Sequence, residues 1–288
     1  MDALVLAAGP NNGRLRSCHT ASMEALIPIG RRPMVDYVVQ ALRHCREINR
    51  IVVVGPLALS DYYLEDQRVT VVSGGKDPIE SLQCGLAALA VPAGRTEPAK
   101  HDVLTDGAVL ADQAFSASDK GRDRCEKADQ LLVVTGDLPL LTPQVLEAFL
   151  HACRSREGDV FYPVVRREDC ERRYPDVRRT YVRLQEGWVT GGNLLLIRPS
   201  VIPRALTRAR RFVRLRKSPL ALSRLLGWSF LIRFLLRRLT IAQVEARVSE
   251  LFRLRAVGVL SSSPELGIDV DKPSDLELVR RCLAGLSS

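Results

Sequence analysis

The stretch Leu4–Arg16 reads LVLAAGPNNGRLR, and it changes from apolar to polar at Gly9. A short apolar run that ends at a glycine is typical of a strand buried on both faces. Ala7, Ala8 and Gly9 have little or no side chain, so a ligand could approach the backbone closely, and successive N–H groups in such a turn bind anions. The residues alone leave two interpretations open, a phosphate-binding loop and a strand that simply ends in a turn.

The polar half of this stretch has the composition of a tight loop. Asn11, Asn12 and Gly13 tolerate left-handed backbone, which suits a tight loop. Arg14 and Arg16 could bind phosphate oxygens. Neither a Gly-Lys-Ser/Thr sequence nor a GxGxxG pattern is present, so this is not a Walker A loop or a dinucleotide-binding loop.

Short apolar strands and amphipathic helices alternate after the first loop. Their spacing predicts strands at 50–56, 69–75 and 130–141, the last of which breaks at Gly136, and helices at 33–44, 77–90 and 142–155. This pattern is typical of a three-layer α/β/α fold with a mostly parallel, Rossmann-like sheet. Ligands of such sheets bind beyond the carboxyl ends of the strands, so the loops after Ala8, Gly74 and Thr135 can converge on one site.

Two segments interrupt the alternation. Residues 91–127 are polar and rich in Asp, Lys, Ser, Gly and Pro, which predicts an inserted loop that is either disordered or ordered by a partner. Residues 204–255 carry 14 Lys and Arg against two acidic residues, a net charge of +12, while the whole chain carries +9. Apolar residues recur there at near-helical spacing, so we expect a basic helical insertion in the C-terminal half of a single domain over 1–288.

The composition excludes several classes of protein. A hydrophobic fraction of 46% and a charged fraction of 26% are those of an ordinary globular chain. The seven cysteines are scattered and form no CxxC pair, which argues against a zinc site and a disulfide scaffold and favours a reducing cytoplasm. The longest apolar-rich stretch, 219–236, contains two arginines, so no transmembrane helix is expected. No nucleic-acid reader motif accompanies the basic charge, so nucleic acid is not an expected partner.

Carboxylates follow two of the expected strand ends. Asp137 comes directly after a buried strand and just before Pro139, where it could bind Mg²⁺ or serve only as a turn residue. Asp269 and Asp271 alternate in the extended stretch GIDVD, and we expect them to face opposite sides, so that only one reaches the site. Asp275 is expected to serve the N-terminus of the next helix.

A second glycine turn lies in WVTGGNLLLIRP, residues 188–199, where Gly191 and Gly192 precede Asn193. The Asn193 amide could bind a hydroxyl-bearing substrate. An asparagine chosen for the turn's backbone is the other interpretation.

Taken in order, these motifs resemble the nucleotidyltransferase superfamily with the glycosyltransferase-A-like fold, which includes the MobA-like NTP transferases and the cytidylyltransferases for methylerythritol phosphate. The chain shares the opening LAAGPNNGR, then ALIPIGRRPMVDYVVQAL at 25–42, GDLPLL at 136–141 and a terminal GIDVDKPSDLELVR at 267–280. The stretch GGKDPIESLQCGLAAL at 74–89 is similar to the segment that helps hold the base. The resemblance covers about residues 1–90, 128–200 and 258–282.

The resemblance implies a reaction and a set of roles. An acceptor phosphate attacks the α-phosphorus of an NTP and pyrophosphate leaves, with catalysis by Arg14, Asp137 and Asp271. Asp137 and Asp271 would hold Mg²⁺, and Gly192 and Asn193 would lie toward an anionic small-molecule acceptor. The implied nucleotide-binding residues are Leu6, Ala7, Ala8, Gly9, Asn12, Gly13, Arg14, Gly74, Gly75 and Ser81. The spacing of Gly74, Gly75 and Ser81 resembles the cytidylyltransferase branch and favours CTP.

The chain departs from the family pattern at two positions. Glu24 stands where the family has a lysine, ten residues after the loop arginine, and an anion there repels a triphosphate. Arg16, Arg31 or Arg32 could compensate, or Glu24 could bind a second metal ion or a cationic acceptor group. Lys272 replaces the threonine of the terminal motif, where a pair with Asp271 would compete with metal binding.

Three hypotheses follow from the sequence. The first is a Mg²⁺-dependent nucleotidyltransferase, and the second is an inactive relative that binds nucleotide and acts through partners. The third is that the basic helical segment lies on an anionic membrane and brings the enzyme to a lipid-linked acceptor. The alternative to this third hypothesis is that the basic segment forms a helical cover over the acceptor side, or a homo-oligomer surface.

Overall fold

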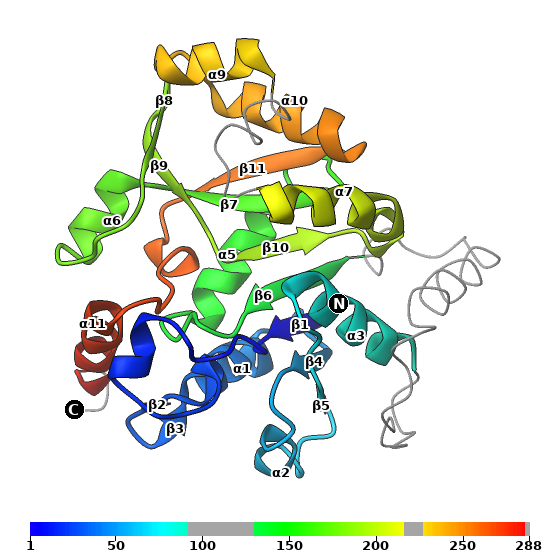
Figure 1. The fold of residues 1–288 in the computed structure, drawn as a ribbon, viewed down its shortest axis with the longest axis vertical. Coiled ribbons are helices and arrows are strands. Elements are labelled where there is room, and N and C mark those ends of the chain that lie inside the picture. Colours follow the sequence, from blue (N-terminus) through cyan, green and yellow to red (C-terminus); the bar gives the residue numbers. More distant parts are fainter. Residues whose placement is uncertain (92–129, 216–226, 286–288) are drawn as a thin grey trace.

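A computed structural model describes residues 1–91, 130–215 and 227–285. A mixed sheet forms the centre of the molecule, with helices on both faces (Figure 1). Its parallel half is ordered β5 (Val69–Val72), β4 (Arg50–Val54), β1 (Asp2–Leu6) and β6 (Leu131–Thr135). The three-layer α/β/α architecture predicted from the sequence is confirmed.

The other half of the sheet begins with a change of direction. It continues with β10 (Leu194–Ile197), β7 (Val160–Arg166), β9 (Gly187–Gly191) and β8 (Val182–Leu184). β10 is antiparallel to both β6 and β7, and β8 and β9 form an antiparallel hairpin. β11 (Ala256–Ser261) pairs with β7 in parallel, and a small separate sheet joins β2 (Pro28–Ile29) to β3 (Arg32–Pro33).

Alternate residues of β1 divide the core into two layers. Ala3 and Val5 point to one face, where they pack with apolar residues of α1 (Met34–His44) and α5 (Pro143–Cys153). Leu4 points to the other face, toward α3 (Pro78–Ala90) and the start of α7 (Ile202–Leu215). Because side chains of a strand alternate with period two, a wholly apolar strand needs a helix layer on each face.

The predicted starts of two helices are observed. Asp77 caps α3, where its Oδ1 accepts hydrogen bonds from the N–H groups of Ile79 and Glu80. Thr142 caps α5 through the N–H of Val145. Each cap is followed by a proline, which suits the first helical position because its missing N–H has no partner there in any case.

The remaining described helices lie around the edges of the sheet. They are α2 (Leu59–Tyr62), α6 (Arg167–Arg173), α9 (Trp228–Leu235), α10 (Ile241–Phe252) and α11 (Pro273–Ala284), with 3₁₀-helices η1 (Arg14–Ser17), η2 (Glu24–Leu26), η4 (Pro199–Val201) and η5 (Pro264–Leu266). α9 and α10 lie at the top of Figure 1, near β8 and β11, while α11 lies beside β2.

Both predicted insertions fall partly outside the described residues. The polar insertion at 91–127 is outside them except for Val91, and the basic segment at 204–255 holds α7, α9 and α10 in its described part. No described helix combines the length and the apolar character that a membrane span requires. The six described cysteines are free thiols, and the cytoplasmic location stays a prediction.

Candidate functional site

The first loop begins where β1 ends at the carboxyl edge of the sheet. Ala7 is buried, and its N–H donates to the carbonyl oxygen of Val54 at 2.7 Å. A Cβ atom added to Gly55 or Gly136 would lie 3.1 or 3.0 Å from the Ala7 Cβ. Ala7 is therefore small because the ends of β4 and β6 close around it, while Leu6 is partly buried against the core.

Gly9 and Gly13 have a different reason for being small. A Cβ atom at either position would meet only a carboxylate oxygen of Glu24, at the ordinary contact distance of 3.7 Å. Packing within the protein therefore does not require glycine at 9 or 13. Open space beside both glycines supports the interpretation that a ligand approaches the backbone here.

The first loop does not use the left-handed backbone that its asparagines and glycine would tolerate. Gly13 has φ of −96°, and Asn11 and Asn12 also lie outside the left-handed region. The buried Asn11 instead fixes the loop with its side chain, because Nδ2 donates to the carbonyl oxygens of His19 and Ala21 at 2.8 and 3.0 Å. Asn12 is exposed.

The turn after β5 packs directly against the first loop. A Cβ atom on Gly74 would lie 2.2 Å from the Ala8 Cβ, and one on Gly75 would lie 2.3 Å from the Glu80 Cβ. The buried Ser81 accepts a hydrogen bond from the Gly75 N–H at 3.1 Å. Close packing thus accounts for both glycines, and Ser81 holds their turn against the loop.

We expect an alanine substitution at Gly74 to lower the stability of the protein, and one at Gly9 to weaken nucleotide binding. Gly74→Ala should destabilise the protein by about 1–3 kcal/mol, because overpacking forces Ala8 or the turn to move. Gly9→Ala should leave the melting temperature within about 2 °C of wild type but weaken nucleotide binding at least about tenfold, because its methyl group enters the ligand space. Thermal unfolding and nucleotide titration of both variants measure this. Wild-type nucleotide affinity in Gly9→Ala would remove this loop from the binding site.

Three carboxylates converge beside the first loop. Asp137, Asp269 and Asp271 each place one oxygen within 4.8 Å of the others. The expectation that Asp269 and Asp271 face opposite sides is wrong, because residues two apart in an extended chain share a side. Val270 between them points the other way and is fully buried, and its N–H donates to the Asp137 carbonyl oxygen at 3.0 Å.

Burial and mutual repulsion make this cluster a place for a cation. Burial raises the pKa of Asp137 above its ordinary value, and the neighbouring Asp271 raises it further, while a hydrogen bond from Thr135 Oγ1 opposes the rise. Glu24 is the fourth carboxylate of the region. Its pKa is raised by burial and then by the charges of Asp137 and Asp271, so it lies close enough to the cluster to be repelled by it.

The cations considered from the sequence are mostly engaged elsewhere. Arg16 donates to the carbonyl oxygens of Thr20 and Ala21, and Arg32 pairs with the buried Asp36 at 3.3 Å. Lys272 does not pair with Asp271, since its Nζ lies 2.9 Å from the Arg178 carbonyl oxygen and 3.7 Å from Asp275. Arg14 and Arg31 are exposed.

Arg179 is the cation that the sequence did not indicate. It lies between α6 and β8, and its Nη1 forms an ion pair with Asp269 of the cluster. Only 14% of its side chain is exposed. An arginine in an irregular loop, about 90 residues from its partner in sequence, has no local motif that could have identified it.

The β9–β10 turn lies next to the cluster. A Cβ atom on Gly192 would lie 2.6 Å from the Pro163 Cγ, so packing requires this glycine. The Asn193 backbone donates to the Leu266 carbonyl oxygen at 2.9 Å and accepts from the Thr135 N–H at 3.1 Å. These bonds anchor the turn to β6 just before Asp137, and the partly exposed Asn193 side chain forms no hydrogen bond to a described residue.

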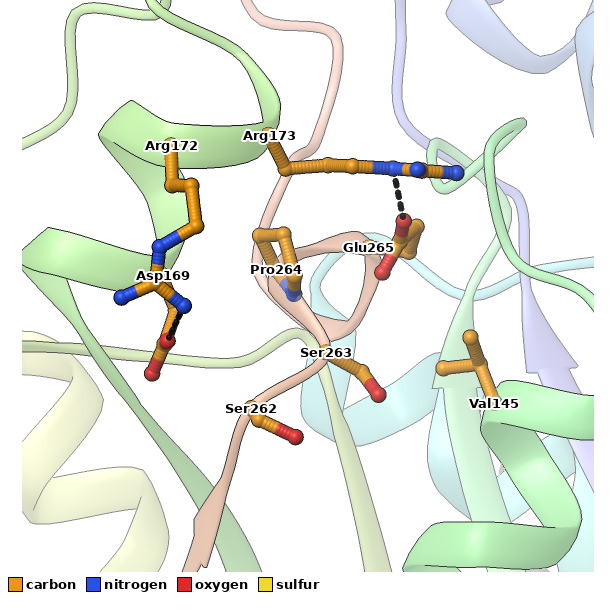
Figure 2. Close-up of a pocket in the computed structure, with 8 residues that line it drawn as sticks. All are labelled: Val145, Asp169, Arg172, Arg173, Ser262, Ser263, Pro264 and Glu265. Carbon is orange, nitrogen blue, oxygen red and sulfur yellow. Dashed lines mark hydrogen bonds and ion pairs between the residues drawn. The ribbon is translucent and has the colours of Figure 1, made fainter.

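A hollow of about 480 Å³ between α5, α6 and η5 contains none of the predicted site residues (Figure 2). Its arginines are paired with acids, Arg172 with Asp169 at 3.3 Å and Arg173 with Glu265 at 3.7 Å. We therefore place the candidate site at the carboxylate cluster. The residues that line the hollow are Val145, Asp169, Arg172, Arg173, Ser262, Ser263, Pro264 and Glu265.

The model of the MobA-like NTP transferase domain family matches residues 3–225 of this chain. The chain belongs to that family. The match spans the first loop, the Gly74–Gly75 turn, Asp137 and the β9–β10 turn, while Asp269 and Asp271 lie beyond it. A search of curated proteins finds no significant match to this chain.

Solved structures show the same fold. A hypothetical transferase from Thermus thermophilus is 34% identical, with a TM-score of 0.71 over 96% of this chain and 98% of that one. A 4-diphosphocytidyl-2C-methyl-D-erythritol synthase is 14% identical, with a TM-score of 0.53 over 98% and 97% of the two chains. The enzyme of that name from Anaerococcus prevotii is 10% identical, with a TM-score of 0.50 over 98% and 97%. The last two likenesses show the fold alone.

Proposed function

We propose that this MobA-like NTP transferase moves a nucleoside monophosphate from an NTP to a phosphorylated small-molecule acceptor. An oxygen of the acceptor phosphate attacks the α-phosphorus, the bond from that phosphorus to the bridging oxygen breaks, and pyrophosphate leaves. The observation that carries the proposal is the carboxylate cluster beside a glycine loop with open space. Membership of the family supports the class of reaction.

The donor set of the cluster suits Mg²⁺, which prefers carboxylate oxygens and often takes only one or two from a protein beside substrate phosphates. Asp137 and Asp271 would hold the ion, with Asp269 as a third donor within 4.8 Å. When bound, Mg²⁺ would offset the charge that develops on the transferred phosphate. Desolvation and the neighbouring Asp271 raise the pKa of the partly buried Asp137, and a cation at the cluster would oppose that rise by favouring the ionised carboxylate.

The chain's own residues then bind and orient the two substrates. Backbone N–H groups of the first loop lie where the triphosphate would bind, and the exposed Arg14 would pair with its β- and γ-phosphates. The Asn193 amide would orient the acceptor. Fixing two reactants in this way replaces an encounter in solution by a reaction within one complex, which is a large part of such catalysis.

The nucleotide we propose first is CTP, on the spacing of Gly74, Gly75 and Ser81. Pyrophosphate release tests the proposal, with CTP, GTP, ATP and UTP each offered with Mg²⁺ and a pool of phosphorylated metabolites. Release with one NTP, absent without Mg²⁺, is the expected result. Nucleotide binding without release from any NTP would instead favour the second hypothesis, an inactive relative with a regulatory role.

A specific observation also favours a membrane-surface role for the basic segment. α9 and the residues after it expose four apolar side chains among three exposed arginines and no acidic residue. Apolar side chains ringed by arginine suit an anionic lipid surface. The apolar residues are Ile232, Phe234, Leu235 and Leu236, exposed by 53%, 40%, 68% and 60%, and the arginines are Arg233, Arg237 and Arg238.

Co-sedimentation with anionic liposomes at low salt tests this role. The wild type should sediment with the liposomes, and Leu235→Glu should reduce the bound fraction several-fold, because a charge in the apolar face opposes insertion. Leu64→Glu is the matched control, since Leu64 is 75% exposed on a different surface, after α2. Absence of wild-type binding would end the membrane hypothesis.

A further inference from the structure

We propose that Arg179 is the acceptor-binding cation of this enzyme, and that Asp269 holds it in place until a metal ion takes that carboxylate. The proposal rests on the proposed function, because it assumes that the carboxylate cluster binds a divalent cation. It adds a residue that no family motif in this chain contains.

The first observation is the position of the Arg179 guanidinium. Among the described residues, Asp269 is the member of the cluster for which an ion pair is found, and Arg179 is its partner. Both side chains are largely buried, with 14% and 13% exposed. Burial raises the pKa of Asp137 and of Tyr162, and the guanidinium opposes both rises, as expected of a positive charge close to the cluster and to β7.

The second observation is what surrounds the guanidinium on the acceptor side. A Cβ atom added to Gly191 would lie 2.4 Å from the Tyr162 Oη, so the tyrosine ring covers the end of β9. Asn193, the residue predicted to face the acceptor, follows two positions later. Arg179 is thus paired with a carboxylate of the cluster and acts on Tyr162, whose ring packs against the strand that leads into the acceptor turn.

Arg179 and a metal ion would compete for the Asp269 carboxylate. An oxygen of Asp269 that is paired with a guanidinium is less available to a metal ion, so metal binding and the ion pair oppose each other. Once the pair is broken, a mostly buried guanidinium without a counter-ion is unfavourable. Arginine binds phosphate through two parallel hydrogen bonds, so the acceptor phosphate is the natural replacement for Asp269.

The position of Arg179 also bears on the missing positive charge at position 24. The family lysine is replaced by Glu24, and Arg16 and Arg32 are engaged with other groups. Arg179 supplies a cation at the same cluster from a different part of the chain. Its charge acts on the acceptor side of the cluster, and so it compensates without occupying the position of the lysine.

Metal binding alone gives the first test, with Mn²⁺ titrated into the nucleotide-free protein and free Mn²⁺ measured by electron paramagnetic resonance. Arg179→Gln should bind Mn²⁺ about tenfold more tightly than wild type, because Asp269 is released. Arg178→Gln is the matched control, since the exposed Arg178 side chain forms no ion pair with a described residue, and it should bind as wild type. Unchanged or weaker Mn²⁺ binding in Arg179→Gln would overturn the proposal.

The second test measures the binding of inorganic phosphate, the group that Arg179 is proposed to bind once its ion pair with Asp269 is broken. In Mn²⁺-loaded protein, Arg179→Gln should bind phosphate at least about tenfold more weakly than wild type. Without metal, Asp269→Asn should bind phosphate more tightly than wild type, because the substitution frees Arg179 from its ion pair. If Arg179→Gln does not fold, this variant alone tests the proposal. Unchanged phosphate binding in Asp269→Asn would refute the acceptor role.

The outcomes separate this proposal from the proposed function. Wild-type Mn²⁺ binding that is lost in Asp137→Ala but unaffected by Arg179→Gln would leave the transferase standing and reject the role of Arg179. Absence of Mn²⁺ binding in every variant, wild type included, would reject the metal site and the Arg179 proposal together.

Discussion

Asp137→Ala is expected to lower pyrophosphate release by at least about a thousandfold, equivalent to ~4 kcal/mol of lost transition-state stabilisation. Asp137 is a partly buried member of the cluster just after β6, and its carboxylate would be the most strongly held metal ligand. The side chain can be removed with little effect on the fold, because the bond from the Val270 N–H is to the Asp137 backbone. Steady-state pyrophosphate release, with thermal unfolding beside it, measures both effects.

The control for this substitution is Asp61→Asn in α2, which is exposed and lies away from the cluster. It should retain full activity. Asp137→Ala should also be no less stable than wild type in the absence of metal, because it removes a partly buried carboxylate whose pKa is raised by desolvation and by Asp271. Activity in Asp137→Ala within tenfold of wild type would show that this carboxylate is not a metal ligand in the reaction.

Glu24→Lys is expected to tighten the binding of metal-free nucleotide by about a hundredfold, or ~2.7 kcal/mol. The Glu24 carboxylate oxygens border the positions of Gly9 and Gly13, so they face the space that the triphosphate would occupy. At ~4 Å and an effective dielectric of ~20, one pair of unit charges interacts by about 4 kcal/mol, and solvent at the half-exposed Glu24 reduces that figure. Titration of a nucleotide in EDTA measures the effect.

Glu65→Lys is the control for net charge, since Glu65 is exposed in the connection between α2 and β5. It should leave nucleotide affinity nearly unchanged. With Mg²⁺ present, a smaller gain in Glu24→Lys would indicate that Glu24 helps to hold metal, and its effect on turnover would show whether the glutamate assists or opposes catalysis. Weaker metal-free binding in Glu24→Lys would contradict the proposed position of the triphosphate.

The parallel half of the sheet could be predicted because its signals are local. Continuous apolar strands, Asp77 and Thr142 before prolines, and the small residues after β1 each act within a few positions of the chain. The reversal at β10 could not be predicted in the same way. Its four residues are as apolar as those of a parallel strand, since a strand covered on both faces has the same composition in either direction.

The sequence by itself determined the alternation of strands and helices up to residue 155, the family motifs and the position of Asp137, because each depends on residues close together in the chain. Only the tertiary structure decided which glycines are required by packing, at 74 and 192, and which leave space for a ligand, at 9 and 13. It also brought Asp269 and Arg179 into the candidate site. The physical reason is that contacts between distant segments depend on how the core clusters fold the loops together, and no local pattern encodes that distance.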